Sequence, residues 1–387
     1  MQDLSQLIQD FLAPQERFET IRREALSRAR RGLCDLGYAN PWDGPSPEVV
    51  EVIGDSLKGA RPLDLQYTPY GGATITRRIV AQSLGSDYHW KDVVLTPGAM
   101  AALNLAFRCL KDEDPQAEVI VITPCWLDTP LYLANLGIKP VMVPLDKDSL
   151  RLDVDAIAAA ITPHTRALVL SQPANPTGIL YHREELNQVA QVLENAPTKP
   201  LWISDECHRD VAFGGQEFVS PRELYDRTCT VFSFGKAFAL QGQRIGYLAV
   251  SPRMEERTHL AERYERLCRV MGFCTPTSLM QLALRNLIGV KLDWTLLSER
   301  REKALSVLQD AGYEVVPSQA TFFLYPKSPI ADEFEFCERL AARGLLTLPA
   351  GMFHHSGHFR ISLTATDAML ERGLDVLKGV MEWRKSA

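Results

Sequence analysis

The segment TVFSFGKAFALQGQRIGYLAV, residues 230–250, carries the strongest signal for both the fold and the chemistry of this chain. It places Ser233, Lys236 and Arg244 around a glycine-containing turn that leaves one apolar run and enters another. A lysine buried at the end of a strand has a lowered pKa, so its free amine can attack a carbonyl group. The serine hydroxyl and the arginine guanidinium are groups that bind a phosphate.

These three side chains together favour a particular ligand. An aldehyde that also carries a phosphate is pyridoxal 5'-phosphate (PLP), and the segment therefore predicts that Lys236 forms a Schiff base with this cofactor. A second interpretation stays open at this point, because a lysine at a strand end can also be a solvated surface charge. The other motifs of the chain have to separate the two.

Seven short apolar runs alternate with amphipathic stretches between about residues 67 and 287. Strands connected by helical crossovers indicate an α/β fold with a mostly parallel, seven-stranded sheet covered by helices on both faces. Ligands in such folds bind at the carboxyl ends of the strands. The runs are VVLTPG (93–98), VIVITP (119–124), PVMVPL (140–145), ALVLSQP (167–173), LWISDE (201–206), TVFSF (230–234) and GYLAV (246–250).

The pattern predicts two domains. Residues 60–289 form the large PLP-binding domain, and residues 1–59 and 290–387 form a smaller α+β domain. The smaller domain begins with an N-terminal helical segment. Its first helix is expected to end at Pro14, and a second helix is expected from about Glu16 to Arg31.

Composition excludes several classes of protein. The chain has 387 residues, 46% of them hydrophobic and 23% charged, as in a soluble globular protein. A net charge of −6 gives no reason to expect nucleic acid or membrane as a partner. The eight cysteines show no CxxC pair and no zinc-like spacing, so we expect no metal site and a reducing compartment. With neither a signal peptide nor a transmembrane run expected, we predict a cytoplasmic protein.

Two motifs after early strands can hold parts of a cofactor. LTPGAMAALN, residues 95–104, turns on Gly98 and opens a helix, so the backbone N–H groups near Ala99 and Met100 point toward an anion. Such turns are also common without any ligand. Trp126 follows the next strand and could stack on a pyridine ring, although this residue taken alone favours a tryptophan that lines the core or the surface.

Three further motifs supply polar side chains. Asn175 lies in an Asn-Pro-Thr-Gly turn and could donate to a phenolate oxygen, or be part of a plain turn. Asp205 ends an apolar strand and could pair with a protonated pyridine nitrogen; a magnesium aspartate is the competing role, but the GxxxxGK[ST] loop is missing. His208 could bind the phenolate oxygen or serve a structural contact. Arg360 in HFRISLTAT could read a carboxylate or form a structural salt bridge.

Taken together, these motifs resemble those of a fold-type I PLP enzyme of the class I/II aminotransferase family, from about Gly37 to Leu377. The resemblance implies that Lys236 is the Schiff-base lysine and that Asp205 pairs with the ring nitrogen. It implies that Asn175 donates to the phenolate oxygen, that Trp126 stacks on the ring and that Arg360 grips the substrate carboxylate. The phosphate-binding positions it implies are Tyr67, Gly98, Ala99, Met100, Ser233 and Arg244.

The sequence departs from the family pattern at three positions. His208 stands where the family usually has tyrosine; a neutral imidazole can replace the hydroxyl as a donor, whereas an imidazolium would stabilise the phenolate further. Ala39 takes the place of a loop glycine near the substrate carboxylate. Gly235 precedes Lys236, where many relatives have serine.

The resemblance implies an aminotransferase that moves the amino group of an L-amino acid to a 2-oxo acid through Lys236. In the family, the tyrosine of YTPYGG reaches the phosphate of the neighbouring subunit, so a homodimer with shared active sites is implied, with Tyr67 in that role. The alternative is a PLP-dependent lyase, synthase or cyclase that acts by elimination or replacement. A transcription regulator built on an aminotransferase body would need a DNA-binding domain, and only about 36 residues precede Gly37.

Overall fold

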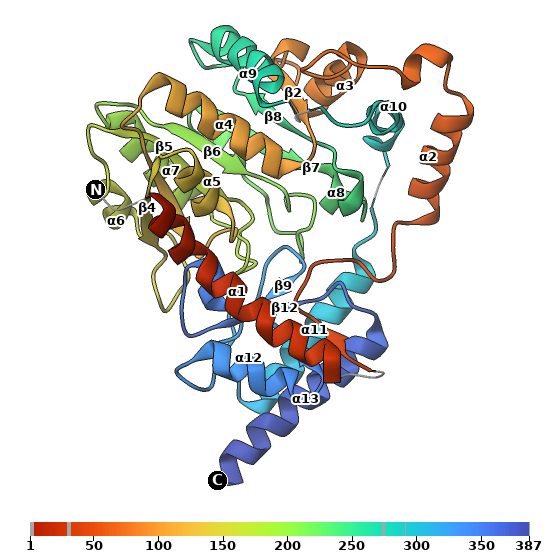
Figure 1. The fold of residues 1–387 in the computed structure, drawn as a ribbon, viewed down its shortest axis with the longest axis vertical. Coiled ribbons are helices and arrows are strands. Elements are labelled where there is room, and N and C mark those ends of the chain that lie inside the picture. Colours follow the sequence, from red (N-terminus) through yellow and green to blue (C-terminus); the bar gives the residue numbers. More distant parts are fainter. Residues whose placement is uncertain (1–3, 29–31, 273–274, 291, 387) are drawn as a thin grey trace.

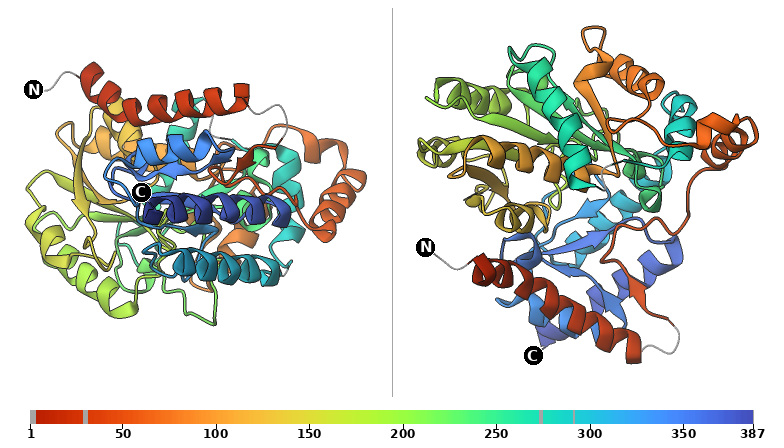
Figure 2. Two further views of the ribbon diagram at one scale, coloured as in Figure 1. Left: turned by 90° about the horizontal axis from the view of Figure 1, so that it is seen from below. Right: turned by 45° about the horizontal axis from the view of Figure 1, so that its top comes forward.

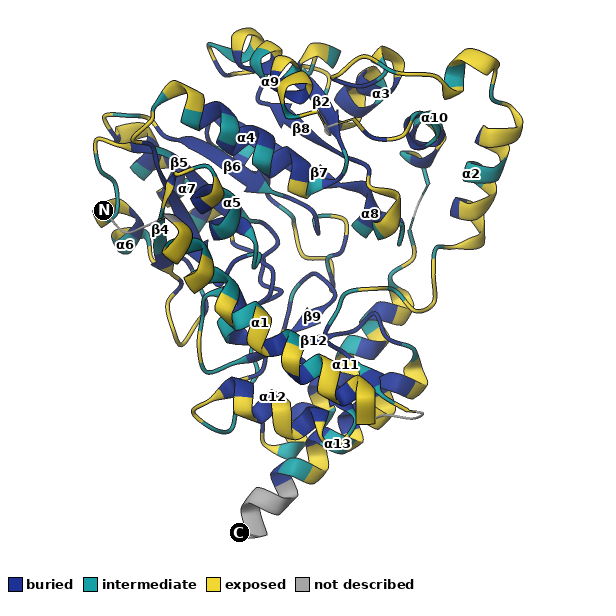
Figure 3. Ribbon diagram, in the orientation of Figure 1, coloured by how far each residue is buried: buried dark blue, intermediate teal, exposed yellow. Residues whose placement is uncertain are grey.

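A computed structural model describes residues 4–28, 32–272, 275–290 and 292–386. The described chain forms a larger part around one broad sheet and a smaller part that contains the C-terminal helix (Figure 1). Apart from the edge strand at residues 139–144, the strands of the broad sheet are buried almost throughout, while the outer faces of the surrounding helices are exposed (Figure 3).

The broad sheet has seven strands in the order β2-β8-β7-β6-β5-β3-β4. Strands β3 to β7 are parallel to one another, and β8 is antiparallel to both of its neighbours, β2 and β7. Each of the seven apolar runs contains one strand, and the predicted fold class is confirmed. The strands are β2 (Val93–Thr96), β3 (Glu118–Thr123), β4 (Lys139–Pro144), β5 (Thr165–Ser171), β6 (Leu201–Asp205), β7 (Thr228–Ser233) and β8 (Gly246–Val250).

Helices cover both faces of this sheet. They are α2 (Pro47–Lys58), α3 (Thr74–Leu84), α4 (Ala99–Glu113), α5 (Thr129–Asn135), α6 (Val154–Ala159), α7 (Arg183–Asn195), α8 (Phe234–Ala237), α9 (Arg257–Met271) and α10 (Ser278–Leu287). Side chains alternate across a strand, so Val119 packs with α4 and α9, while Ile120 packs with α6 and α7 on the other face. At the β2 end, α3 and α10 complete this second face.

The smaller part contains a three-stranded antiparallel sheet and a parallel pair of two-residue strands. Helices α11 and α13 pack against each other there, and their apolar faces share one core with these strands. The elements are β1 (Cys34–Asp35), α11 (Thr295–Ala311), β9 (Phe323–Leu324), α12 (Glu333–Ala341), β10 (Leu345–Leu346), β11 (Leu348–Pro349), β12 (Phe359–Ser362) and α13 (Asp367–Ser386).

The N-terminal segment corrects one prediction. A single helix, α1 (Leu4–Arg28), runs through Pro14, so the expected break at this proline is wrong. Proline has no N–H and leaves one carbonyl of the helix without its partner. Burial of Phe18 and Ile21 against the smaller part offsets that loss. The expected extension of the helix to Arg31 lies outside the described residues.

Two further placements bear on the predicted domains. Helix α1 runs along the outside of the molecule and contacts both α5 and α12 (Figure 2). Helix α2 packs on α10, beside the broad sheet. The division at residues 59 and 289 stays a prediction. Within the described chain, no helix is long and apolar enough to cross a bilayer.

Candidate active site

The reversed direction of β8 gathers the first group of predicted site residues. Gly246, the first residue of β8, lies opposite Thr96 at the end of β2 and opposite Ser233 at the end of β7. Because β8 is antiparallel to both neighbours, its beginning meets the ends of two strands that are far apart in the sequence. The turn at Gly98 and the residues Ser233 and Arg244 are therefore brought to one place.

Gly98 and Arg244 form a close contact at this place. Gly98 has φ +79°, and a β-carbon there would lie 2.6 Å from Nη2 of Arg244. The same guanidinium contacts the sulfur of Met100 at 3.8 Å, in the first turn of α4. Only glycine combines this backbone conformation with room for the guanidinium. Free N–H groups at the start of α4 and a nearby positive charge make the turn suitable for an anion.

Lys236 lies on the short helix α8, directly after β7. Burial lowers the pKa of its amine to about 8. The charges of Arg360 and Arg244 lower this pKa further, whereas Cys207 and Asp205 oppose the shift. An amine with such a pKa is partly unprotonated at neutral pH, so it can act both as a nucleophile and as a proton acceptor.

Asp205 ends β6 and faces the same interior. Burial raises the pKa of its carboxyl group, and a hydrogen bond of 3.1 Å from the backbone N–H of Cys207 works against that rise. The positive charge of Lys236 also favours the ionised form. A buried carboxylate is costly unless it meets a cation, so this position is suited to a positively charged ring nitrogen.

His208 follows three residues later and is 3% exposed. Burial, together with the charges of Lys236 and Arg360, lowers the pKa of its imidazole well below the ordinary value. This shift favours the neutral imidazole over the imidazolium. Its edge meets the rings of Phe322 and Phe323, and its Nδ1 atom has no hydrogen-bond partner.

Arg360 and Asn175 lie in direct contact. The Arg360 guanidinium donates to Oδ1 of Asn175 at 3.1 Å and to the carbonyl oxygen of Gly37 at 2.9 Å. It lies 4.0 Å from the ring centre of Phe323 and 4.7 Å from that of Phe353. Burial lowers its pKa to about 9. The guanidinium is thus held in one orientation by two rings and two acceptors, as recognition of a planar carboxylate requires.

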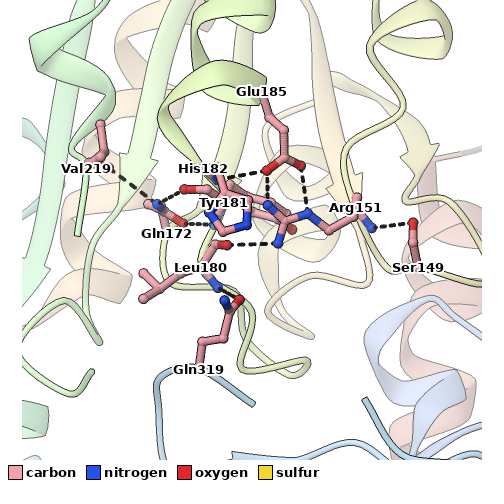
Figure 4. Close-up of polar contacts among 9 residues, drawn as sticks. All are labelled: Ser149, Arg151, Gln172, Leu180, Tyr181, His182, Glu185, Val219 and Gln319. Atoms are coloured by element: carbon pink, nitrogen blue, oxygen red, sulfur yellow. Dashed lines mark hydrogen bonds and ion pairs between the residues drawn. The ribbon is translucent and has the colours of Figure 1, made fainter. Parts of the chain in front are cut away.

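The side chain of Gln172 joins the two ends of the loop that carries Asn175 (Figure 4). Its buried amide donates to the carbonyl of Tyr181 at 3.1 Å and accepts from the N–H of the same residue at 3.1 Å. Arg151 donates to the carbonyl of Leu180 at 2.9 Å. These contacts close the 172–181 loop. Gln172 was not predicted from the sequence. Its position directly before Pro173, at the end of β5, was the signal that could have indicated its role in this loop.

The remaining predicted residues lie at different depths. The indole Nε1 of Trp126 is buried without a partner. The carbonyl of Ala39 accepts from Gln241, whose own carbonyl accepts from Arg244. Tyr67 is fully exposed, at 105%, so no other part of the described chain covers its side chain.

Gly235 has a physical reason to be small. A β-carbon at this position would lie 3.0 Å from the Cα atom of Gln241 and 3.2 Å from the carbonyl oxygen of Leu240. The loop that leads to Arg244 therefore packs directly on the residue before Lys236. A serine here would push that loop outward.

Comparison with known proteins identifies the family of this chain. The family model for aminotransferase class I and II matches residues 31–377. This chain belongs to the class I and II aminotransferase family. An aspartate/prephenate aminotransferase of Thermus thermophilus is 30% identical and covers 92% of the chain and 93% of its own length. A probable aspartate/prephenate aminotransferase of Aquifex aeolicus is 26% identical and covers 94% and 95%.

Solved structures agree with these relatives. An amino transferase from Eubacterium rectale superposes with a TM-score of 0.88 at 26% identity, over 96% of this chain and 95% of that chain. A Thermus thermophilus aspartate aminotransferase mutant has a TM-score of 0.85 at 26% identity, over 94% and 96%. The chain is thus a transferase that moves an amino group, and its family uses PLP.

The residues present fit this cofactor. Among the described residues, the buried polar atoms that lack a partner include Nδ1 of His208, Nε1 of Trp126 and Nε of Arg360, each on a predicted site residue. Unpartnered buried polar atoms are rare in folded proteins unless a ligand or water completes them. The cradle between Gly98 and Arg244 has the shape and charge that a phosphate needs.

Proposed function

We propose that this aminotransferase uses Lys236 as its catalytic amine, with Asp205, Asn175 and His208 around the cofactor ring. The single observation that supports this most strongly is the partly buried Lys236 amine, whose pKa is lowered to about 8 by desolvation and by the charges of Arg360 and Arg244, against the opposing effect of Cys207 and Asp205. In this proposal Gly98, Ala99, Met100, Ser233 and Arg244 bind the phosphate. Trp126 lies against the ring.

When bound, PLP supplies an electron-accepting ring that stabilises negative charge at the substrate Cα. Asp205 keeps the ring nitrogen protonated, because a buried carboxylate favours a cation beside it. Arg360 binds the substrate carboxylate and thereby fixes the direction of the Cα–H bond. Lys236 would accept the proton from Cα of the substrate and deliver it to the C4′ carbon of the cofactor.

Replacement of Lys236 tests this assignment. Lys236→Ala should lower turnover by at least about 10³-fold, since both a nucleophile and a general base are lost. Purified Lys236→Ala should also lack the visible absorbance that arises when the cofactor is bound to this lysine. Full turnover by the variant would contradict the proposal.

The substrates are an L-amino acid and a 2-oxo acid, and the names of the relatives suggest which to test first. Aspartate and an aromatic amino acid should each be mixed with the enzyme without an acceptor. Accumulation of the amino form of the cofactor, with release of a 2-oxo acid, is expected from transamination. Return of the starting spectrum together with an eliminated product would instead support the lyase alternative.

We further propose a homodimer in which Tyr67 completes the site of the other subunit. Tyr67 is fully exposed, and Leu63, Tyr70 and Ile75 nearby are exposed by 83%, 44% and 50%. A run of exposed apolar side chains of this kind marks a protein interface. Met100, which is 41% exposed, contacts Arg244, so the phosphate site reaches the exposed surface of the single chain.

Subunit complementation tests the shared site. Lys236→Ala and Tyr67→Ala chains, each of low activity alone, are co-expressed. Mixed dimers would contain one intact site, so random pairing should restore about a quarter of wild-type activity. No recovery in verified mixed dimers would show that Tyr67 does not act across the interface.

Buried free thiols such as Cys34, Cys125 and Cys207 fit the reducing cytoplasm, where we place the enzyme.

A further inference from the structure

We propose that Glu19 and Tyr38 are positioning residues through which helix α1 holds the substrate-carboxylate arginine. Tyr38 follows Gly37, whose carbonyl oxygen accepts a hydrogen bond from Nη2 of Arg360 at 2.9 Å. The hydroxyl of Tyr38 donates to Oε1 of Glu19 on α1 at 2.6 Å. The helix is thereby connected to Arg360 through two adjacent residues of the loop, Tyr38 and Gly37. This inference rests on the proposed role of Arg360.

The loop between Asp35 and Ala39 is attached at its two ends. The N–H of Leu36 donates to the carbonyl of Leu346 at 2.9 Å, the carbonyl of Leu36 accepts from the N–H of Ser362 at 2.7 Å, and the carbonyl of Ala39 accepts from the Gln241 side chain at 3.4 Å. The backbone N–H of Gly37 donates to the Asp35 carboxylate at 3.0 Å, and that of Tyr38 reaches the same oxygen at 3.4 Å. These two contacts lie within the loop itself, so they shape the turn at Gly37 between the attached ends. The Tyr38 side chain attaches the middle of the loop to α1, because its ring meets Phe18 and lies under the Arg22 guanidinium.

Near Glu19, helix α1 packs against the smaller part of the molecule. Phe18 is completely buried and packs in one cluster with Leu348 and Phe353. Phe353 is also one of the two rings that enclose the Arg360 guanidinium. Helix α1 therefore supports the arginine from two sides, through the ring of Phe353 and through the carbonyl of Gly37.

The consequence concerns binding rather than chemistry. A guanidinium that keeps both acceptors is already oriented when the substrate arrives, so little freedom is lost on binding. Loosening the Tyr38 contact lets the Gly37 carbonyl shift away from the Arg360 guanidinium, whose bond to Asn175 stays in place. The carboxylate should bind more weakly, while Lys236 and the residues around the cofactor stay in place.

The test uses Tyr38→Phe, which removes only the hydroxyl, and Glu19→Leu, which removes the acceptor of its hydrogen bond. Binding of propionate to the PLP-loaded enzyme is measured by titration calorimetry, because propionate carries the carboxylate but no amino group to react. Each variant should raise the dissociation constant for propionate roughly five- to tenfold. KM for the amino acid should rise by a similar factor with kcat changed less than about twofold, as for lost ground-state binding.

Arg17→Met is the matched control. Arg17 lies on the same helix and binds Asp332 at 2.9 Å, a contact to the smaller part that does not reach Gly37. This variant should leave the dissociation constant for propionate unchanged. The double variant Glu19→Leu/Tyr38→Phe should bind propionate no more weakly than either single variant, because both substitutions remove the same hydrogen bond.

The outcomes separate the two proposals. Unchanged propionate binding in Tyr38→Phe would overturn the role of α1, as would an equal loss in Arg17→Met, because the effect would then come from general loosening of the helix. Either result leaves the Lys236 assignment intact, since that depends on Lys236→Ala. Cofactor affinity serves as a further readout and should be the same in all four variants.

Discussion

Arg360 and Asn175 are joined by a hydrogen bond of 3.1 Å between Nη1 of the arginine and Oδ1 of the amide. The first residue lies on β12 of the smaller part, and the second lies in the loop after β5 of the broad sheet. Because the amide oxygen accepts from Arg360, the amide NH₂ group is left to donate elsewhere. One asparagine can therefore serve both the substrate arginine and the phenolate oxygen of the cofactor.

Asn175→Asp should weaken substrate binding more than Asn175→Ala does. A carboxylate at this position would form an ion pair with Arg360 and compete with the substrate carboxylate. We expect KM for the amino acid to rise about 10- to 100-fold in the aspartate variant. Steady-state kinetics of both variants provide the measurement, and equal KM values for the two would contradict the competition.

Lys236→Met should stabilise the cofactor-free protein in a pH-dependent way. The folded pKa of about 8 lies below the ordinary value of 10.5, so at pH 7 the protein carries the cost of a buried charge, about 3 kcal/mol. As the pH rises from 8 toward 10.5, the folded state releases the proton before the unfolded state does. The wild type therefore gains stability in this window, and the advantage of the methionine variant shrinks. Urea unfolding at pH 7 and pH 9.5 measures the difference; a constant advantage would show that the amine is not buried.

Gly98→Ala should weaken cofactor binding by about 10- to 100-fold, as expected for losing a hydrogen bond to a charged group. The new β-carbon would displace the Arg244 guanidinium, which lies 2.6 Å away. Gly214→Ala is the matched control, because Gly214 also has a positive φ, +63°, with no atom within 4 Å of the added carbon. Both variants carry the same kind of backbone strain. Fluorescence titration of the cofactor-free proteins with PLP separates them, and an equal loss in both would mean that strain alone explains it.

His208 should stay neutral from pH 8 down to pH 5. An ordinary histidine gains its proton near pH 6.5, but burial and the charges of Lys236 and Arg360 oppose protonation here. Nuclear magnetic resonance of ¹⁵N-histidine-labelled protein, with His208→Gln to assign the signal, measures the charge state. A midpoint near pH 6.5 for this signal would show that the ring meets solvent.

The strands of the broad sheet could be predicted because the apolar runs that form them are short and bounded by turn residues. Positions such as Asp205 and Asn175 could be predicted for the same reason, since a polar residue directly after a buried strand lies at the sheet edge where ligands bind. The contact between Arg360 and Asn175 could not, because the two residues are 185 positions apart and nothing local reports their meeting.

Pro14 shows where local rules fail. Its missing N–H predicts the end of a helix, yet α1 continues because Phe18 and Ile21 bury their side chains against other elements. The charge of His208 was open for a related reason. Its pKa depends on Lys236 and Arg360, and the sequence does not show how close either charge lies to it.

The antiparallel insertion of β8 also determines when the molecule can take up its cofactor during synthesis. Strand β2 hydrogen-bonds to β8 and to no other strand of the broad sheet, and about 150 residues separate the two along the chain. A nascent chain that stops before Gly246 has Gly98 but neither β8 nor a framework to place it beside Ser233. Binding of PLP to ribosome-bound chains of increasing length would therefore show at which chain length β8 pairs with β2 and β7.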